Sequence, residues 1–365
     1  MISITLFPGR YIQGPSALSR LGGECARLGD NVLLIASPHS RTHLPLSSLP
    51  GMPDSCGVHI ETFGRQCSDE EIQRLADCGK EAGCNVVVGV GGGKTLDAAK
   101  AVAHQVKTPS IMVPTIASTD APCSSVCVVY TPEGVFKRAD ILPRNPDVVI
   151  VDTRIMAEAP VRFLAAGMGD ALATWFEAES CRVKRAPNMA GEVGSMTAYA
   201  LARLCRDTLM DYGALALAAC AAKTVTPALE RVVEANTLLS GLGFESAGLA
   251  AAHSIHNGFT VLPQTASSYH GEKVAFGTLV SLFLTDREPS LIEQTYAFCE
   301  SVGLPTCLAD LGLRGVSYED LLRVAEKACA AEESIHNEPF EVSPWVVADM
   351  IRAADAWGEK RKAAQ

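Results

Sequence analysis

The chain has 365 residues, of which 48% are hydrophobic and 20% charged, and its formal net charge is −10. This length exceeds the size at which one hydrophobic core usually keeps growing, so two domains are expected. The acidic balance argues against nucleic acid and against an anionic membrane surface as partners, because proteins that bind either one usually carry a surplus of Lys and Arg. No apolar run is long enough to span a bilayer, and the first residues show no secretory signal pattern.

Thirteen cysteines are scattered along the chain without a Cys-x-x-Cys pair. This arrangement disfavours a zinc ribbon and a thioredoxin-type motif. Free thiols in such number suit a reducing compartment, so the expected location is the cytoplasm.

Short β-rich runs alternate with helical patterns over the first part of the chain. Near-continuous Val, Leu and Ile in several runs favour burial on both faces, as in a parallel sheet. The predicted strands cover residues 31–36, 58–63, 85–90, 110–113 and 148–151. Ser68 starts a predicted helix over residues 68–82, with Glu71 three positions on. The alternation predicts a doubly wound α/β domain.

After about residue 160 the strands disappear and helical spacing takes over. The predicted helices cover residues 162–182, 189–212, 227–239, 244–259, 271–284, 290–302, 317–331 and 343–360. The sequence therefore predicts an α/β domain over residues 1–159, followed by an all-helical domain over residues 160–365.

A glycine-rich turn follows the predicted strand at residues 85–90. It contains Gly91, Gly92 and Gly93, with Lys94 and Thr95 at the start of the next helix. Such a turn directs backbone N–H groups at a phosphate, and glycine lets the backbone approach it closely. Neither the dinucleotide fingerprint nor the Walker A spacing fits, so the turn indicates a diphosphate without naming the nucleotide. An ordinary glycine turn with a capping threonine is the alternative.

A second loop, residues 115–124, places hydroxyl side chains around Asp120. Loops after strand ends line the ligand crevice in such sheets. Hydroxyls around one carboxylate suit hydrogen bonds to amide, ribose or alcohol groups. Turn chemistry alone also explains Ser, Thr, Asp and Pro here, so both interpretations stay open.

Three potential metal ligands, Asp170, His253 and His270, lie among small residues. Small neighbours leave room for an ion with a substrate on it. One aspartate and two histidines suit Zn²⁺ with coordination left open. The alternative is structural: Asp170 caps a helix, His253 packs inside one, and His270 opens the next. The sequence does not show whether the three meet.

Long motifs across the chain closely resemble the glycerol dehydrogenases, which belong to the metal-dependent, iron-containing-type alcohol dehydrogenase superfamily. The motifs are GGGKTLDAAK, PTIASTDAPCS, VYTPEGVFKR, GMGDALATWFEA, TPALERVVEANTLLSG, GFESAGLAAAHSIHNG and HGEKVAFG. The resemblance implies a Rossmann-like NAD-binding domain before an all-α domain, with the active site in the cleft between them. The implied reaction is zinc-dependent oxidation of glycerol and related vicinal diols to dihydroxyacetone, with hydride transfer to NAD.

The resemblance also implies roles for single residues. Asp170, His253 and His270 are expected to hold the catalytic zinc, and Asp120 is expected beside the polyol. With the glycine turn, the positions expected to bind the cofactor are Gly91, Gly92, Gly93, Lys94, Thr95, Asp97, Thr115, Ser118, Ser124, Val126 and Tyr130. A homo-oligomer, an octamer in the family, is expected as well.

Two positions depart from the wider superfamily. Iron-type relatives carry a histidine one helical turn after the metal aspartate, where this chain has Thr174. Glycerol dehydrogenases also lack it, and three protein ligands leave space for two hydroxyls of a diol. Ser37 replaces an aspartate that would bind the adenosine ribose and reject a 2′-phosphate. NAD is therefore expected, with weakened discrimination against NADP. His256 is expected near the metal without being a ligand.

Other functions remain as alternatives. A reductase of small keto acids or aldehydes needs few pocket changes, although Asp120 would repel an acidic substrate. A lyase of the dehydroquinate synthase type needs basic residues around a substrate phosphate, and no Lys/Arg cluster lies near the metal motifs. A non-catalytic NAD- or metal-binding protein is disfavoured by the complete set of three ligands.

Overall fold

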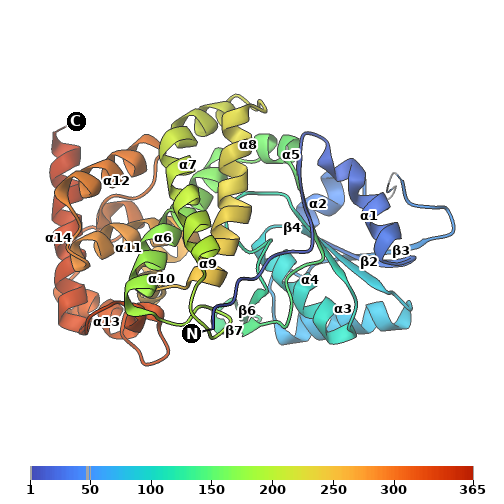
Figure 1. Ribbon diagram of the computed structural model, residues 1–365, viewed down its shortest axis with the longest axis horizontal. Coiled ribbons are helices and arrows are strands. Elements are labelled where there is room, and N and C mark those ends of the chain that lie inside the picture. Colours follow the sequence, from blue (N-terminus) through green and yellow to red (C-terminus); the bar gives the residue numbers. More distant parts are fainter. Residues whose placement is uncertain (1, 47–48, 50, 365) are drawn as a thin grey trace. The chain divides into compact units, whose positions relative to one another are not determined.

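The computed structural model describes residues 2–46, 49 and 51–364, shown as a ribbon in Figure 1. Within this part, the chain divides into two compact units. The α/β unit consists of Leu6–Pro160 and Ala219–Gly241. The helical unit consists of Val161–Ala218 and Leu242–Gln365, together with the N-terminal residues through Thr5. The position of the active site between the two units stays a prediction.

A parallel sheet forms the centre of the α/β unit. In the described part it has six strands, in the order β1 (Tyr11–Gly14), β8 (Val148–Asp152), β5 (Ser110–Pro114), β4 (Val86–Gly91), β2 (Asn31–Ala36) and β3 (Gly57–Thr62). All neighbours pair in parallel. The five strands predicted from the sequence are confirmed. Strand β1 was not predicted, because its four residues are only partly buried and form no apolar run.

Helices cover both faces of this sheet. Val32 and Leu34 of β2 share a core with Leu21 of α1 (Leu21–Leu28). On the opposite face, Gly79 of α3 (Asp69–Glu81) lies against Leu33. Helix α4 (Gly93–Val106) packs beside α3 (Figure 1). Burial on both faces explains the nearly continuous apolar runs of the strands.

The connections place a switch point between β2 and β4. From β2 the chain moves out to β3 and then returns to the other side of β2 as β4. Ser37, which follows β2, donates its backbone N–H to Val90 at 2.9 Å, and Thr115, which follows β5, donates to Gly91 at 3.0 Å. Ser37, the glycine turn and Thr115 therefore meet at the carboxyl ends of the strands, where such sheets bind ligands.

The remaining elements of the α/β unit are short. They are α2 (Pro38–His43), a hairpin of β6 (Val126–Tyr130) and β7 (Phe136–Ile141), α5 (Thr153–Glu158), α8 (Pro227–Glu234) and a π-helical turn (Ala235–Leu239). The hairpin was not predicted from the sequence, because β7 is largely exposed and carries alternating polar residues.

Residues 219–241 lie in the α/β unit, although the sequence placed them in the helical domain. Hydrogen bonds explain the difference. The Tyr11 hydroxyl lies 2.7 Å from Thr237 Oγ1, and Gln13 donates to the Glu230 carbonyl at 2.9 Å. Local helical periodicity in this segment carries no information about such distant partners. The chain enters the helical unit after Pro160, beside the predicted boundary.

The helical unit is built around a buried helix, α11 (His270–Leu284), whose residues are apolar or small nearly all round, as expected for a core helix. It packs against α6, α10 and α14. The other helices are α6 (Val161–Lys184), α7 (Met196–Ala221), α9 (Ser240–Ala247), α10 (Ala251–Phe259), α12 (Pro289–Ser301), α13 (Tyr318–Ala328) and α14 (Pro344–Ala363). Across the described residues, the structure contains no helix with the length and apolar character needed to cross a membrane.

One predicted helix is wrong as a continuous element. Residues 244–259 form two helices, α9 and α10, separated at residues 248–250. Gly248 has a φ of 101°, in the left-handed region that favours glycine, and a Cβ there would lie 2.8 Å from Cys181 Sγ. The break gives α10 its own N-terminus, and His253 lies in its first turn.

Candidate active site

The three predicted metal ligands converge in the helical unit. Asp170 comes from α6, His253 from α10 and His270 from the start of α11. Their ligand atoms all lie within 4.8 Å of one another. The Nε2 atoms of His253 and His270 are 3.4 and 2.9 Å from Asp170 Oδ1. The structure therefore brings together side chains whose proximity the sequence did not show.

Two glycines allow α6 and α11 to approach so closely. A Cβ on Gly271 would lie 1.8 Å from the Ala166 carbonyl oxygen, and one on Gly169 would lie 2.3 Å from the Gly271 carbonyl oxygen. Any larger side chain would separate the two helices. Gly169 and Gly271 are the sequence neighbours of Asp170 and His270, so the close approach positions both ligands.

The Asp170 carboxylate is 1% exposed, and within the described residues neither of its oxygens accepts a hydrogen bond of good geometry. Burial raises the pKa of Asp170, but the electrostatic interaction with His270 and the interactions with His253 outweigh it and hold the pKa below its usual range. Burial lowers the pKa of His253, whereas Glu177 and Asp170 raise it well above the usual value. The carboxylate and the neighbouring imidazoles thus interact strongly through charge and hydrogen bonding.

This donor set fits a divalent ion. Four ligands placed about 2.0–2.1 Å from one tetrahedral zinc lie roughly 3.3 Å apart, close to the Nε2–Oδ1 separations of His253 and His270 from Asp170. A buried carboxylate without a hydrogen-bond partner, facing two imidazole nitrogens, is satisfied by coordination. A packing or capping role for Asp170 would leave Oδ2 without a hydrogen-bond partner among the described residues, at a cost in stability.

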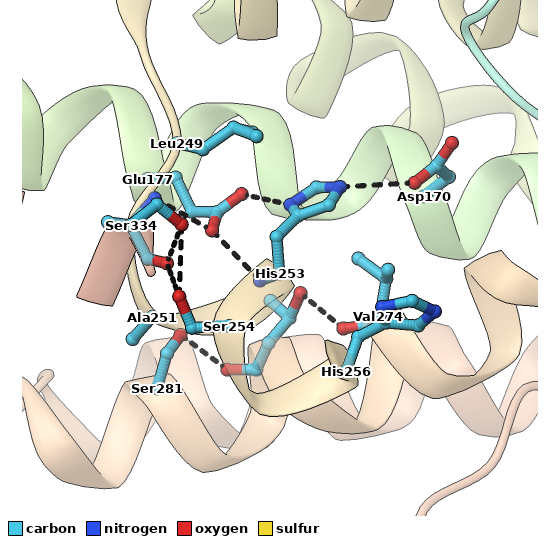
Figure 2. A network of polar contacts seen from close by, with 12 residues as sticks. Asp170, Glu177, Leu249, Ala251, His253, Ser254, His256, Val274, Ser281 and Ser334 are labelled. Atoms are coloured by element: carbon cyan, nitrogen blue, oxygen red, sulfur yellow. Dashed lines mark hydrogen bonds and ion pairs between the residues drawn. The ribbon is translucent and has the colours of Figure 1, made fainter. Parts of the chain in front are cut away.

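Each imidazole is oriented by a hydrogen bond at Nδ1, the ring nitrogen that does not face Asp170. His253 Nδ1 lies 2.6 Å from Glu177 Oε2, and Figure 2 shows this ring between Glu177 and Asp170. The sequence analysis missed Glu177. A signal was present, because Glu177 lies two helical turns after Asp170 in α6 and therefore on the same face.

A longer chain of hydrogen bonds holds the other imidazole. His270 Nδ1 lies 3.0 Å from His256 Nε2, and His256 Nδ1 lies 3.0 Å from Asn257 Oδ1. Asn257 donates from Nδ2 to Glu333 at 2.8 Å, which leaves its Oδ1 as the acceptor for His256. His256 therefore donates from Nδ1, and its Nε2 accepts the proton that His270 carries on Nδ1. The Nε2 atom of a neutral His270 then has a free lone pair, and it faces Asp170. His256 thus lies behind a potential ligand, as the sequence predicted.

Thr174, the position that holds a fourth ligand in iron-type relatives, is buried and packs against α9. A Cβ on Gly243 would lie 2.3 Å from Thr174 Cγ2. The methyl group therefore contacts the α9 backbone, and the three-ligand set gains no further donor from this position.

In the α/β unit, the glycine turn opens α4. Gly92 caps the helix without a side chain, in extended conformation. A Cβ on Gly92 would lie 3.0 Å from Ile116 Cδ1, and one on Gly93 would lie 3.2 Å from Thr119 Oγ1. Larger residues would crowd the second loop and fill the space before the helix N-terminus. The turn thus fits a diphosphate in shape and in the direction of its N–H groups.

Lys94 follows directly. Its Nζ donates to Gln66 Oε1 at 2.7 Å and lies 4.6 Å from the centre of the Tyr130 ring. Burial lowers the pKa of the Lys94 ammonium below that of an exposed lysine. Two predicted cofactor-binding residues, Lys94 and Tyr130, are therefore in contact with each other.

Asp97 is buried, and both of its carboxylate oxygens contact other residues of the α/β unit. It is 6% exposed, and its Oδ1 is 2.9 Å from Lys100 Nζ, while Oδ2 accepts the Val128 N–H at 3.2 Å. Burial raises the pKa of Asp97, and Lys100 opposes that rise. Lys100 also donates to the carbonyls of Ala121 and Ser124. The pair ties α4 to the second loop and to Val128 of β6.

The second loop contains two further polar features. Ser124 is buried, and its Oγ has no hydrogen-bond partner in the described part of the chain. Asp120 is partly exposed, and its Oδ2 accepts a hydrogen bond from Ser240 Oγ at 2.8 Å. Every predicted cofactor position lies in the α/β unit, and the three predicted metal ligands lie in the helical unit.

Comparison with known proteins extends these observations. The family model for iron-containing alcohol dehydrogenase matches residues 8–153. A glycerol dehydrogenase of Thermotoga maritima is 59% identical over 362 residues, 99% of each chain. A glycolaldehyde reductase of Halobacterium salinarum is 42% identical over 366 residues, again 99% of each chain. The crystal structure of a probable glycerol dehydrogenase from Sinorhizobium meliloti has a TM-score of 0.93 at 43% identity and covers 98% of this chain and 100% of that chain.

These similarities confirm the predicted fold class and the resemblance inferred from the motifs. The matches cover 98–99% of this chain. The chain belongs to the iron-containing alcohol dehydrogenase family and is an alcohol oxidoreductase.

Proposed function

We propose that the protein oxidises glycerol and related vicinal diols at the secondary carbon, giving dihydroxyacetone from glycerol, and reduces NAD. The convergence of Asp170, His253 and His270 carries this proposal, because an alcohol must be activated before it can lose a hydride. The similarity to the Thermotoga maritima glycerol dehydrogenase supports glycerol as the substrate.

We propose Zn²⁺ as the metal. One carboxylate and two neutral imidazoles are typical of a catalytic zinc site with a position left open for substrate. Bound zinc acts as a Lewis acid that lowers the pKa of a coordinated hydroxyl. Asp170 contributes the negative charge, and the Nε2 atoms of His253 and His270 the neutral donors. With Thr174 supplying no fourth donor, two neighbouring hydroxyls of a diol have room to bind together.

NAD is the proposed hydride acceptor. The N–H groups at the start of α4 and the Lys94 ammonium would bind its diphosphate. The Ser124 hydroxyl, which has no hydrogen-bond partner among the described residues, suits a hydrogen bond to the cofactor. The other proposed cofactor positions are Gly91, Gly92, Gly93, Thr95, Thr115, Ser118, Val126 and Tyr130. Asp97 supports this set through Lys100 rather than by contact.

We assign Asp120 to the hydroxyl groups of the polyol. A carboxylate accepts hydrogen bonds from hydroxyls, and Ser240 holds one of its oxygens in place. The same negative charge repels a carboxylate on the substrate. The assignment therefore favours polyols over hydroxy acids and keto acids.

The reduction of small hydroxyaldehydes is a second candidate. The 42% identity to a glycolaldehyde reductase over the full length favours it. The same three residues would hold the ion that polarises an aldehyde oxygen, and NADH would supply the hydride. Steady-state rates in both directions distinguish the two, because a reductase would show a far higher kcat/KM for the aldehyde than for glycerol.

Two variants test the proposal against a panel of glycerol, diols, keto acids and aldehydes. His270→Ala should lose bound zinc and at least about 100-fold in kcat/KM while keeping most of its NAD affinity.

Asp120→Asn should raise the KM for glycerol by about 10-fold or more, because hydrogen bonds to charged groups contribute about 1.5–3 kcal/mol. Turnover by His270→Ala without bound metal, or unchanged polyol kinetics in Asp120→Asn, would contradict the respective assignment.

We also place the protein in the cytoplasm, because its cysteines are free thiols. A homo-oligomer is the proposed assembly. Analytical ultracentrifugation at several protein concentrations tests this proposal, because it measures the mass of the assembly in solution.

A further inference from the structure

We propose that Glu177 is a positioning residue that fixes the tautomer of His253 and so prepares its Nε2 to bind metal. The proposal rests on the metal centre proposed above. It adds a residue outside the ligand set, and it assigns a specific task to that residue.

The contacts of Glu177 carry the proposal. Its side chain is 1% exposed, Oε2 lies 2.6 Å from His253 Nδ1, and Oε1 accepts the backbone N–H groups of Ala250 and His253 at 2.9 and 3.0 Å. A carboxylate can only accept hydrogen bonds, so the proton of a neutral His253 ring must reside on Nδ1. The lone pair is then on Nε2, which faces Asp170 (Figure 2). An outer carboxylate of this kind also makes the imidazole a stronger ligand.

A competing explanation is that Glu177 only caps α10. The cap residue Ala250 offers no side-chain hydrogen bond, so the first N–H groups of α10 need acceptors from elsewhere. Glu338 shares this task, because its Oε1 accepts the Ala251 N–H at 3.1 Å and the residue is 1% exposed. Glu338 thus binds the same helix end through Ala251, whereas Glu177 reaches the His253 ring as well.

Glu177→Gln separates the two roles. If the amide oxygen keeps the backbone N–H groups, the NH₂ group faces His253 Nδ1 and forces the proton onto Nε2, the wrong nitrogen for metal binding. If the amide is reversed, its NH₂ meets two buried N–H donors, at a cost in stability. Neither orientation reproduces the carboxylate.

The experiment measures zinc affinity by chelator competition in wild type, Glu177→Gln and Glu338→Gln, with NAD affinity and urea stability recorded in parallel. Glu177→Gln should bind zinc about 10- to 100-fold more weakly, the usual effect of losing an outer partner of a ligand. Glu338→Gln should bind zinc within about threefold of wild type, even if both variants lose similar stability. Excess zinc should restore turnover in Glu177→Gln, with the activation midpoint shifted by the same factor.

Equal zinc affinities in the two variants would overturn the proposal and leave a capping role. If Glu177→Gln does not fold, Glu177→Asp and Glu338→Asp make the same comparison, because shortening withdraws a carboxylate from His253 in the first and from Ala251 in the second. Failure of the underlying function looks different, since wild type itself would then bind no zinc or oxidise no polyol.

Discussion

Two of the residues proposed to meet a ligand have buried polar atoms. The carboxylate oxygens of Asp170 and the hydroxyl of Ser124 are buried, and the described residues offer them no hydrogen-bond partner of good geometry. A buried polar group left in this state costs about 1–3 kcal/mol. A bound metal or cofactor would remove that cost, which supports the roles proposed for Asp170 and Ser124.

Lys94 gives a prediction for pH. Its burial lowers the pKa of the ammonium, so the charge is lost at a lower pH than for an exposed lysine. The cationic form binds the diphosphate, so NAD affinity should fall as pH rises through that lowered pKa, by about 10- to 100-fold in total. In Lys94→Arg the guanidinium stays charged, and the fall should be absent. Fluorescence titration with NADH from neutral to alkaline pH checks this, and parallel profiles for both proteins would refute it.

Ser37 gives a prediction for cofactor choice. It lies at the carboxyl end of β2, and its Oγ accepts the Ser40 N–H at 3.2 Å as the cap of α2. Wild type should therefore show only a small preference for NAD over NADP. Ser37→Asp should lower kcat/KM for NADP by about 10-fold or more relative to NAD, because the new carboxylate repels the 2′-phosphate while still capping the helix.

Ser37→Asn caps α2 without the charge and serves as the control. A wild type that uses NAD alone would mean that another group excludes the phosphate.

Among the elements, the crossing of α6 and α11 decides the geometry of the metal ligands. Gly271→Ala would place a Cβ 1.8 Å from the Ala166 carbonyl oxygen, so the helices must separate. We expect a loss of about 1–3 kcal/mol in the free energy of unfolding. Zinc affinity should fall as well, because His270 moves with α11. Urea unfolding and zinc competition measure the two effects.

Gly23→Ala in α1 is the matched control. A Cβ there meets nothing within 4 Å, and alanine favours a helix by about 0.5–1 kcal/mol. This variant should be as stable as wild type or slightly more stable. Equal effects of the two substitutions would show that the close approach of α6 and α11 is not needed.

At the scale of the whole molecule, the two ligands should stabilise different units. The proposed zinc ligands lie in α6, α10 and α11, and the proposed cofactor residues in the α/β unit. Zinc at 100 times its dissociation constant adds about 2.7 kcal/mol to the state that binds it. Hydrogen exchange should therefore slow in α6, α10 and α11 with zinc alone, and at the start of α4 with NAD alone. Protection of the same peptides by either ligand would contradict this division.

The sequence was most informative where local pattern and local structure coincide. Four of the five predicted strands, β2, β4, β5 and β8, are buried and rich in Val, Leu and Ile, and such a pattern can be read without knowledge of distant partners. Ser68 Oγ accepts the Glu71 N–H at 3.3 Å, as a helix cap should, although Glu71 itself turns to the Gly64 N–H at 2.8 Å. Local rules predicted where α3 begins, and a tertiary contact decided where the Glu71 side chain points.

By itself the sequence determined the alternation of strands and helices, the glycine turn before α4, and the residue types able to bind metal. The resemblance of the motifs to glycerol dehydrogenases added the expected substrate, cofactor and metal. Only the tertiary structure decided that Asp170, His253 and His270 meet, that residues 219–241 join the α/β unit, and that α10 begins after a break beside Glu177. The physical reason is range: backbone propensity and periodicity act between near neighbours, whereas helix crossings and buried hydrogen bonds join residues far apart in the chain.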